Sequence, residues 1–274
     1  RLRAIIKAID ESSFKEKLSF PKFSPATIEQ VQFAHTSEYV SIVKESIEDG
    51  YRQLPTGDTV ISKGSWEASL LAAGAVISAC DSVMKNEFRS AFCLVRPPGH
   101  HATADRGMGF CIFNNIAIAA RYLQKVYGIR KVLIVDFDVH HGNGTQDIFY
   151  EDDSVFYFSV HEKDIYPGTG RANETGQSKG LGFTLNVELP SGSTDNNALA
   201  AIREKLAPAM QFFHPELLLV SAGFDAHQDD PLGHLKYTSS GYGALAKELI
   251  CLADQYASGH IVFTLEGGYH LNSL

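Results

Sequence analysis

The sequence has few cysteines, no long apolar run and fewer basic than acidic residues. Its four cysteines are scattered without a CxxC pair, which argues against a disulfide framework and favours a reducing, intracellular compartment. No uninterrupted apolar run approaches the ~18 residues needed to span a bilayer, so we expect a soluble protein without a membrane partner. The 24 basic and 32 acidic residues give a net charge of −8, which argues against a nucleic-acid partner. A cytoplasmic protein is expected, or a nuclear one if the source is eukaryotic.

Apolar residues are abundant, and strand-like runs alternate with helical patterns along the chain. They make up 44% of the sequence, enough for a large core. Because no linker or internal repeat interrupts the alternation, we expect one α/β domain over residues 1–274, with a largely parallel sheet flanked by helices. Helices are expected at 1–10, 27–34, 37–48, 66–85 with Ser65 as N-cap, 114–126, 145–150, 196–213 with a kink at Pro208, and 242–256. Strands are expected at 91–95, 132–136, 155–160, 183–189, 217–221 and 261–265.

Polar residues follow the apolar strand at 132–136 in the run DFDVHHGNGT. Side chains alternate along a strand, so Asp136, Asp138 and His140 should project to the same side. Two ionised aspartates in a water-poor pocket would repel each other, and one would take up a proton unless a cation neutralised them. A divalent metal is the simplest such cation. The alternative is a strand end with solvated polar residues.

Three other expected strands also end in polar or glycine-rich turns. The carboxyl ends of parallel strands lie at one edge of a sheet, where ligands bind. Asp138, His140 and Asp225 could therefore form a three-ligand site with an open position for water, the pattern of catalytic zinc, although such a set also accepts iron(II) or cobalt(II). His100 and His101 are candidate general acids and bases because imidazole titrates near neutral pH. The sequence thus predicts a metal-assisted hydrolase.

Five motifs together resemble the zinc-dependent histone deacetylase family, in its class II and bacterial deacetylase-like branch. They are RPPGHHA (96–102), GFCIFNN (109–115), DFDVHHGNGTQ (136–146), SAGFDAH (221–227) and EGGY (266–269). The resemblance extends over nearly the whole chain, in the family's order and spacing. It implies a parallel sheet of about eight strands, shared with arginase. Arginase-like enzymes carry DxHxD and two manganese ions, whereas the DxDxH of this chain favours one transition metal.

The resemblance also implies roles for the polar residues. Asp138, His140 and Asp225 would bind zinc, and Asp136 would orient and charge His100. His100 and His101 would share the roles of base and acid.

Two further catalytic positions follow from the same motifs. His101 would pair with Asn143, where some family members have aspartate. Because an amide supports an imidazolium less than a carboxylate does, His101 should be the less basic histidine. Tyr269 would donate a hydrogen bond to the substrate carbonyl and then to the oxyanion.

Substrate contacts are implied at five positions. Gly109, Phe110 and Tyr166 match a channel for the methylene stem of acyl-lysine, and Asp58 matches a residue that clamps the substrate backbone. By residue type alone, the two aromatics would be core or surface residues and Asp58 a solvated turn residue. At Leu232, family members that prefer acetylpolyamines carry glutamate, so leucine favours acyl-lysine.

The family also places structural potassium or sodium ions near the metal. The resemblance implies one site at Asp136, Asp138, His140, Ser159 and Val160, and a second at Phe149, Asp152, Val155 and Phe183. We expect His141, which matches a position away from the metal, to be structural. The remaining histidines that we considered are expected to be structural or surface residues, and Cys111 to pack; these histidines are His35, His161, His214, His227 and His260.

The implied reaction removes acetyl or related acyl groups from the ε-amine of lysine in proteins or peptides, by means of metal-activated water. Two alternatives remain open at this stage. An acetylpolyamine amidohydrolase would use the same metal site on a small acetylated amine, with acidic groups such as Asp58, Asp105, Asp229 or Asp230 near its entrance. A catalytically weak module that binds acyl-lysine would lack the tyrosine, and Tyr269 argues against it.

Overall fold

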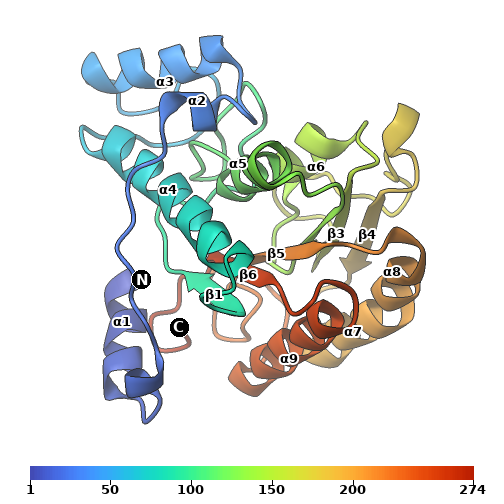
Figure 1. Ribbon diagram of the computed structural model, residues 1–274. Coiled ribbons are helices and arrows are strands. Elements are labelled where there is room, and N and C mark those ends of the chain that lie inside the picture. The colour runs from blue at the N-terminus through green and yellow to red at the C-terminus, as the bar shows by residue number, and fades with distance from the viewer.

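A six-stranded parallel sheet forms the centre of the molecule in the computed structural model, which describes all 274 residues (Figure 1). The strand order is β1-β6-β5-β2-β3-β4. The α/β fold with a parallel sheet is confirmed, but the count of about eight strands was wrong. Other extended segments make only isolated bridges, such as Gln53 with Val60 and Thr194 with Lys236, which do not grow into strands. The strands are β1 (Ser90–Cys93), β2 (Val132–Asp136), β3 (Val155–Glu162), β4 (Thr184–Leu189), β5 (Leu217–Ala222) and β6 (Ile261–Leu265).

Nine α-helices accompany the sheet, and most lie where the sequence predicts them. The segment expected at 27–34 forms only one turn. Gly64, rather than Ser65, is the N-cap of α4, because Ser65 lies inside the helix and its Oγ accepts a hydrogen bond from the Ser62 N–H at 2.9 Å. The helices are α1 (Leu2–Glu11), α2 (Ile28–Val31), α3 (Ser37–Glu48), α4 (Ser65–Met84), α5 (Asn115–Tyr122), α6 (Asn143–Phe149), α7 (Asp195–Ala201), α8 (Ala207–Phe213) and α9 (Ser239–Tyr256).

The helix expected at 196–213 is interrupted near Pro208, as predicted. A π-helical turn, Ile202–Leu206, separates α7 from α8, and Pro208 lies in the first turn of α8. Proline has no N–H to donate and its ring crowds the carbonyl four residues earlier. The wider π-turn accommodates both effects. A second π-turn, Leu123–Tyr127, extends α5, and short 3₁₀ turns lie at Lys15–Lys17 and Ser178–Gly180.

Apolar side chains pack on both faces of the sheet. Along β2, Ile134 belongs to one core with side chains of α3, α4 and α5, while Leu133 and Val135 belong to a second core with α7, α8 and α9. This alternation is the two-residue period of a strand buried on both faces. Figure 1 shows α4 and α5 on one side of the sheet and α7, α8 and α9 on the other. Polar residues that follow the strands are therefore confined to the sheet edge.

Helix α4 is the most apolar helix considered for a membrane span, although polar residues interrupt its sequence. By length and composition it is apolar enough to cross a membrane. Its central residues, including Val76 and Cys80, are fully buried in the first core, and the helix contacts β1, β6 and α5. The apolar character of α4 is thus accounted for by its place against the sheet.

Candidate active site

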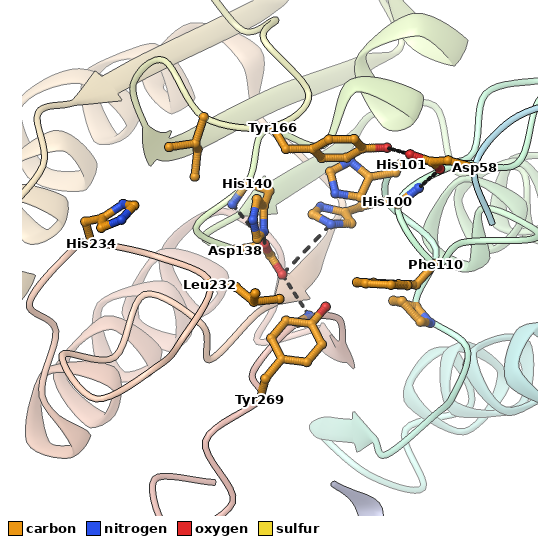
Figure 2. A pocket seen from close by; sticks show the side chains of 14 residues that line it. Asp58, His100, His101, Phe110, Asp138, His140, Tyr166, Leu232, His234 and Tyr269 are labelled. Atoms are coloured by element: carbon orange, nitrogen blue, oxygen red, sulfur yellow. Dashed lines mark hydrogen bonds and ion pairs between the residues drawn. The ribbon is translucent and has the colours of Figure 1, made fainter. Parts of the chain in front are cut away.

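A pocket of about 470 Å³ opens at the carboxyl ends of the strands. The α3–α4 loop and the loops that follow β1, β2, β3, β5 and β6 bring together residues up to 211 positions apart, from Asp58 to Tyr269 (Figure 2). Of the residues predicted from sequence, ten line the pocket: Asp58, His100, His101, Gly109, Phe110, Asp138, His140, Tyr166, Leu232 and Tyr269. The pocket also contains four residues that the sequence analysis left without a role: Pro98, Ile165, His234 and Gly267.

Asp138, His140 and Asp225 form a compact cluster at the floor of this pocket. Their candidate ligand atoms all lie within 4.8 Å of one another. His140 Nδ1 is 3.1 Å from Asp138 Oδ1 and 3.3 Å from Asp225 Oδ2. The second oxygen of each aspartate accepts a main-chain N–H: Asp138 Oδ2 from Gly267 at 2.7 Å, and Asp225 Oδ1 from Val139 at 3.0 Å. Each carboxylate is therefore fixed by one oxygen while the other faces His140.

The charges of this cluster fit a divalent cation. Asp138 and Asp225 are fully buried, and Asp225 Oδ2 has no hydrogen-bond donor. Burial and the charge of Asp138 raise the pKa of Asp225 to about 6. Burial alone would lower the pKa of His140, but its hydrogen bond to Asp138 and the nearby carboxylate of Asp225 raise it to about 10. A proton on His140 thus supplies the positive charge that the cluster needs, and a metal ion replaces such a proton when it binds.

His100 lies beside this cluster and is held by Asp136. Its Nδ1 is 3.0 Å from Asp136 Oδ2, and its Nε2 is 3.9 Å from Asp138 Oδ2. Burial would lower the pKa of His100, but the charges of the two carboxylates outweigh burial and hold it well above its usual value. Asp136 is fixed in turn, since its other oxygen accepts the Asp138 N–H at 3.1 Å.

His101 has a different environment, although its ring centroid lies only 4.0 Å from that of His100. Its Nδ1 is 2.8 Å from Asn143 Oδ1, an amide oxygen without a formal charge. Burial and the neighbouring His100 lower the pKa of His101 well below its usual value. With Nδ1 donating to Asn143, the neutral ring has Nε2 as an acceptor. The expected order of basicity, with His101 below His100, agrees with these directions.

Tyr269 lies on the opposite side of the pocket floor, after β6. Its main-chain N–H donates to Asp230 Oδ2 at 2.6 Å, which fixes the turn. Burial and the charges of Asp225 and Asp138 raise the pKa of the Tyr269 hydroxyl, so it stays protonated at neutral pH. Figure 2 shows this hydroxyl directed towards the part of the pocket that holds Asp138 and His100. It is therefore available as a hydrogen-bond donor.

Aromatic residues and Asp58 form the walls nearer the surface. Phe110 is half-exposed, and the Tyr166 ring meets the His101 ring edge-on at 5.1 Å between centroids. Asp58 accepts hydrogen bonds from the Gly109 N–H at 2.8 Å and the Tyr166 hydroxyl at 3.1 Å. Only glycine fits at Gly109, because a Cβ there would lie 2.2 Å from Cδ2 of His101. Phe110 and Tyr166 thus both line the outer part of the pocket.

Comparison with known proteins identifies this arrangement. The sequence model of the histone deacetylase domain family matches residues 1–274 of this chain. The chain belongs to the histone deacetylase family. It is 41% identical to "Histone deacetylase 10, chloroplastic" of Oryza sativa subsp. japonica over all of this chain and 66% of that protein, and 36% identical to a histone deacetylase-like amidohydrolase of Pseudomonas aeruginosa over 97% of this chain and 70% of that protein. The chain thus spans about two thirds of the length of these relatives.

A solved structure is also similar over the whole chain. The crystal structure of the HDA15 HD domain superposes on this chain with a TM-score of 0.92 at 38% sequence identity. The match covers 100% of this chain and 76% of the chain in that crystal structure. The deacetylase fold is therefore shared as well as the sequence motifs.

Two carboxylates within this deacetylase domain were not recognised from sequence. Glu266 is fully buried, accepts the main-chain N–H groups of Gly99 at 2.6 Å and His100 at 3.2 Å, and so joins the end of β6 to the histidine loop. Burial raises its pKa to about 7. Glu162, at the end of β3, binds His234 at the pocket rim. The role of Glu266 could have been predicted, because it directly follows an apolar strand. Nothing in the sequence linked Glu162 to His234.

The residues implied in monovalent cation sites lie in two groups. Asp136, the last residue of β2, is paired in register with Ser159, which lies within β3, and it accepts the Asp138 N–H. Ser159 Oγ is hydrogen-bonded to His161 Nδ1 at 2.8 Å. The second group surrounds the α6–β3 connection, where Asp152 binds Arg121 and Ser154. Cation binding at either group stays a prediction.

Most of the histidines expected to be structural lie outside the pocket. His141 bonds to Thr169 and Gln146, and His161 to Ser159 and Gly170. His35 is buried and accepts the Asn114 N–H at 2.8 Å. Cys111 is buried, and all four cysteines are free.

Proposed function

We propose that this chain is a metal-dependent deacetylase that removes acetyl or related acyl groups from the ε-amine of lysine in proteins or peptides. The observation that carries the proposal is the convergence of the Asp138-His140-Asp225 cluster, the His100-His101 pair and Tyr269 in one pocket. Membership of the histone deacetylase family supports the reaction class. The aromatic side chains of Phe110 and Tyr166, which line the outer part of the pocket, fit an unbranched methylene stem.

Asp138, His140 and Asp225 would hold the metal, with zinc favoured and iron(II) or cobalt(II) as alternatives. Bound there, the ion supplies a Lewis acid for the amide carbonyl and makes water more acidic. The fixed orientation of both aspartates, through the N–H groups of Gly267 and Val139, preorganises these ligands before the metal binds.

The two histidines would divide the proton transfers. His101 is neutral, with Nε2 as acceptor, so it can take a proton from the attacking water and return it to the leaving amine. His100, held protonated between Asp136 and Asp138, contributes positive charge beside the reacting carbonyl. The Tyr269 hydroxyl donates a hydrogen bond to the carbonyl oxygen, and this bond strengthens as negative charge develops there.

The pocket entrance favours acyl-lysine over acetylpolyamines. Leu232 lines the pocket and is half-exposed, so it offers a cationic polyamine no charge partner. Of the four aspartates considered as alternative acidic groups, only Asp58 lines the pocket. Asp230 instead accepts the main-chain N–H groups of Leu232, Tyr269 and His270.

Zinc-loaded protein assayed on an acetyl-lysine peptide and on acetylspermidine tests the proposal. We expect a higher kcat/KM on the peptide, and we expect Leu232→Glu to shift the ratio towards acetylspermidine. Asp225→Ala should abolish both bound zinc, measured by metal analysis, and activity. Asp49→Ala, at an exposed aspartate outside the pocket, is the matched control. Unchanged zinc stoichiometry in Asp225→Ala would remove Asp225 from the site, and a wild-type preference for acetylspermidine would overturn the substrate assignment.

We also propose that potassium or sodium binds at the two groups of residues described above, because the matching positions of the family hold such ions and the first group includes the buried carboxylates of Asp136 and Asp138. Melting temperatures that do not change when potassium is exchanged for tetramethylammonium would contradict this idea.

A further inference from the structure

His234 is a pocket residue with an unusual anchor. It lies at the rim, and in Figure 2 it stands across the pocket from Asp58 and Phe110. Its side chain is 69% exposed, whereas the side chain of its partner, Glu162, is only 2% exposed. Glu162 Oε2 accepts the His234 main-chain N–H at 2.7 Å, and Oε1 lies 3.0 Å from His234 Nδ1.

In this contact a buried carboxylate holds an exposed imidazole ring in place. Burying a carboxylate is costly unless its oxygens are hydrogen-bonded. Both oxygens of Glu162 are used by the same exposed histidine, and no other side chain or main-chain group donates to them. An ordinary surface histidine needs no such partner. The pair therefore holds the imidazole in one place beside the pocket.

The backbone on either side of His234 is equally constrained. Its carbonyl accepts the Gly192 N–H at 2.9 Å, and the next residue, Leu235, is buried in the core. The preceding Gly233 lies so close to Asp225 and Val139 that a Cβ would come within 2.7 Å of both. His234 is thus presented from a rigid segment that also carries Leu232 and abuts a metal ligand.

The chemistry of the ring follows from the anchor. Unlike His100, which is buried between two carboxylates, His234 is exposed to water and faces one. In the neutral form of its ring, Nδ1 donates to Glu162 and Nε2 is an acceptor that makes no hydrogen bond within the protein. An acceptor at the rim suits an N–H donor. A peptide carries such donors on both sides of an acyl-lysine, whereas a simple alkyl acetamide has none beyond the bond to be cleaved.

We propose that His234 is a substrate-positioning residue whose Nε2 accepts a hydrogen bond from a main-chain N–H next to the acyl-lysine, opposite Asp58. The inference rests on the proposed function. The hydrogen bond to His234 would make the enzyme select acyl-lysine within a peptide over small acetylated amines. This selectivity arises at the pocket entrance and does not involve the metal.

The test compares two variants that each keep one half of the imidazole. In His234→Asn the side-chain NH₂ can replace Nδ1 and keep the bond to Glu162, but nothing replaces Nε2. In His234→Gln the longer amide reaches towards the position of Nε2. The substrates are an acetyl-lysine heptapeptide and N-pentylacetamide, which has the acyl group and the methylene stem without a peptide backbone. His214→Asn, at an exposed histidine far from the pocket, is the control for the same substitution.

We expect His234→Asn to lower the ratio of kcat/KM for the peptide to that for N-pentylacetamide by roughly three- to tenfold, the loss of one neutral hydrogen bond, mainly through KM. His234→Gln should restore part of the ratio, and His214→Asn should leave it unchanged. A further series of heptapeptides has a single main-chain N–H beside the acetyl-lysine removed by N-methylation. At one of these positions, methylation should lower kcat/KM of the wild-type enzyme but should not lower kcat/KM of His234→Asn any further.

An unchanged ratio in His234→Asn would overturn the proposal. If that unchanged ratio comes from an equal loss on both substrates, His234 only supports the loop. Failure of the wild-type enzyme to hydrolyse either substrate would instead contradict the proposed function itself, so the two failures are distinguishable.

Discussion

His100 and His101 are adjacent in sequence, yet the second nitrogen of each ring faces a different partner. A carboxylate, Asp136, faces the first, and an amide, Asn143, faces the second. A carboxylate stabilises an imidazolium, while an amide oxygen only selects the tautomer. The carboxylate therefore favours a protonated His100, and the amide leaves His101 neutral with Nε2 as a free acceptor.

Replacing Asn143 by Asp tests this assignment. A charged partner should raise the pKa of His101, and a base must be deprotonated to act, so the acidic limb of the kcat/KM profile should move to higher pH by about one unit or more. The measurement is a pH–rate profile on an acetyl-lysine peptide, with Asn86→Asp on the surface as the control. A limb that does not move would mean that His101 is not the base.

Tyr269→Phe tests the oxyanion contact. Without the hydroxyl, turnover should fall by roughly two to three orders of magnitude, while substrate affinity changes little, because the bond strengthens only as charge develops on the carbonyl oxygen. Single-turnover kinetics and a binding assay with zinc-loaded protein would separate the two effects. Wild-type turnover in this variant would require another electrophilic partner.

At the residue scale, the sequence was sufficient to predict those parts of the site whose residues lie within a few positions of one another. Asp136, Asp138 and His140 lie within five positions at the end of an apolar strand, so their closeness was expected, although β2 ends at Asp136 and the other two residues lie in the turn that follows it. Glu162 and His234 lie 72 positions apart, and their contact depends on how the loops after β3 and β5 fold. No local pattern indicates such a pairing.

At the scale of the elements, the segment after β6 contacts both aspartates of the candidate metal site. Gly267 donates its N–H to Asp138 Oδ2, and a Cβ at this position would lie 1.9 Å from Asp225 Oδ2. The main chain of the β6 turn therefore forms part of the wall that fixes both aspartates.

Gly267→Ala should accordingly weaken zinc binding by about 10- to 100-fold, the usual effect of disturbing groups that orient metal ligands. Competition with a chelator of known affinity measures the change. Gly243→Ala, in α9, is the control, because nothing lies within 4 Å of a Cβ added there. Undiminished zinc affinity in Gly267→Ala would show that the turn yields without disturbing the aspartates.

Element type and order were well predicted because each of the six strands is a short apolar run between helical patterns. The errors have local causes. The strand number came from the family resemblance, whereas the segments beyond the six strands form only isolated bridges. The cap of α4 was misplaced by one residue because Gly64 and Ser65 both suit a helix start, and only the tertiary structure shows which one is used.

For the molecule as a whole, buried neutral histidines make stability depend on pH. Burial lowers the pKa of His35 to about 4, and likewise that of His161. In the unfolded chain these rings bind a proton near pH 6.5, while in the folded chain they stay neutral until about pH 4. Stability is thus retained above pH 6.5 and lost as the pH falls towards 4, by an amount on the order of 3 kcal/mol for each histidine.

His35→Gln measures this contribution. The amide oxygen can still accept the Asn114 N–H, but the side chain does not titrate. Unfolding free energies from urea titrations between pH 4.5 and 7.5 should fall less steeply for the variant than for the wild type, while loss of metal ligation affects both equally. Parallel curves would show that His35 is protonated in the folded protein.

The strand order has a consequence for the synthesis of the chain. β1 pairs only with β6, and β6 also covers one side of β5. Until Ile261–Leu265 has been made, β1 has no neighbour and β5 has an open edge, the kind of surface on which unfinished chains associate. Tyr269 and Gly267 arrive with the same segment. A ribosome adding roughly 5–20 residues per second therefore completes the sheet and the catalytic pocket within the same few seconds, after most of the helices are already available to shield the exposed edge.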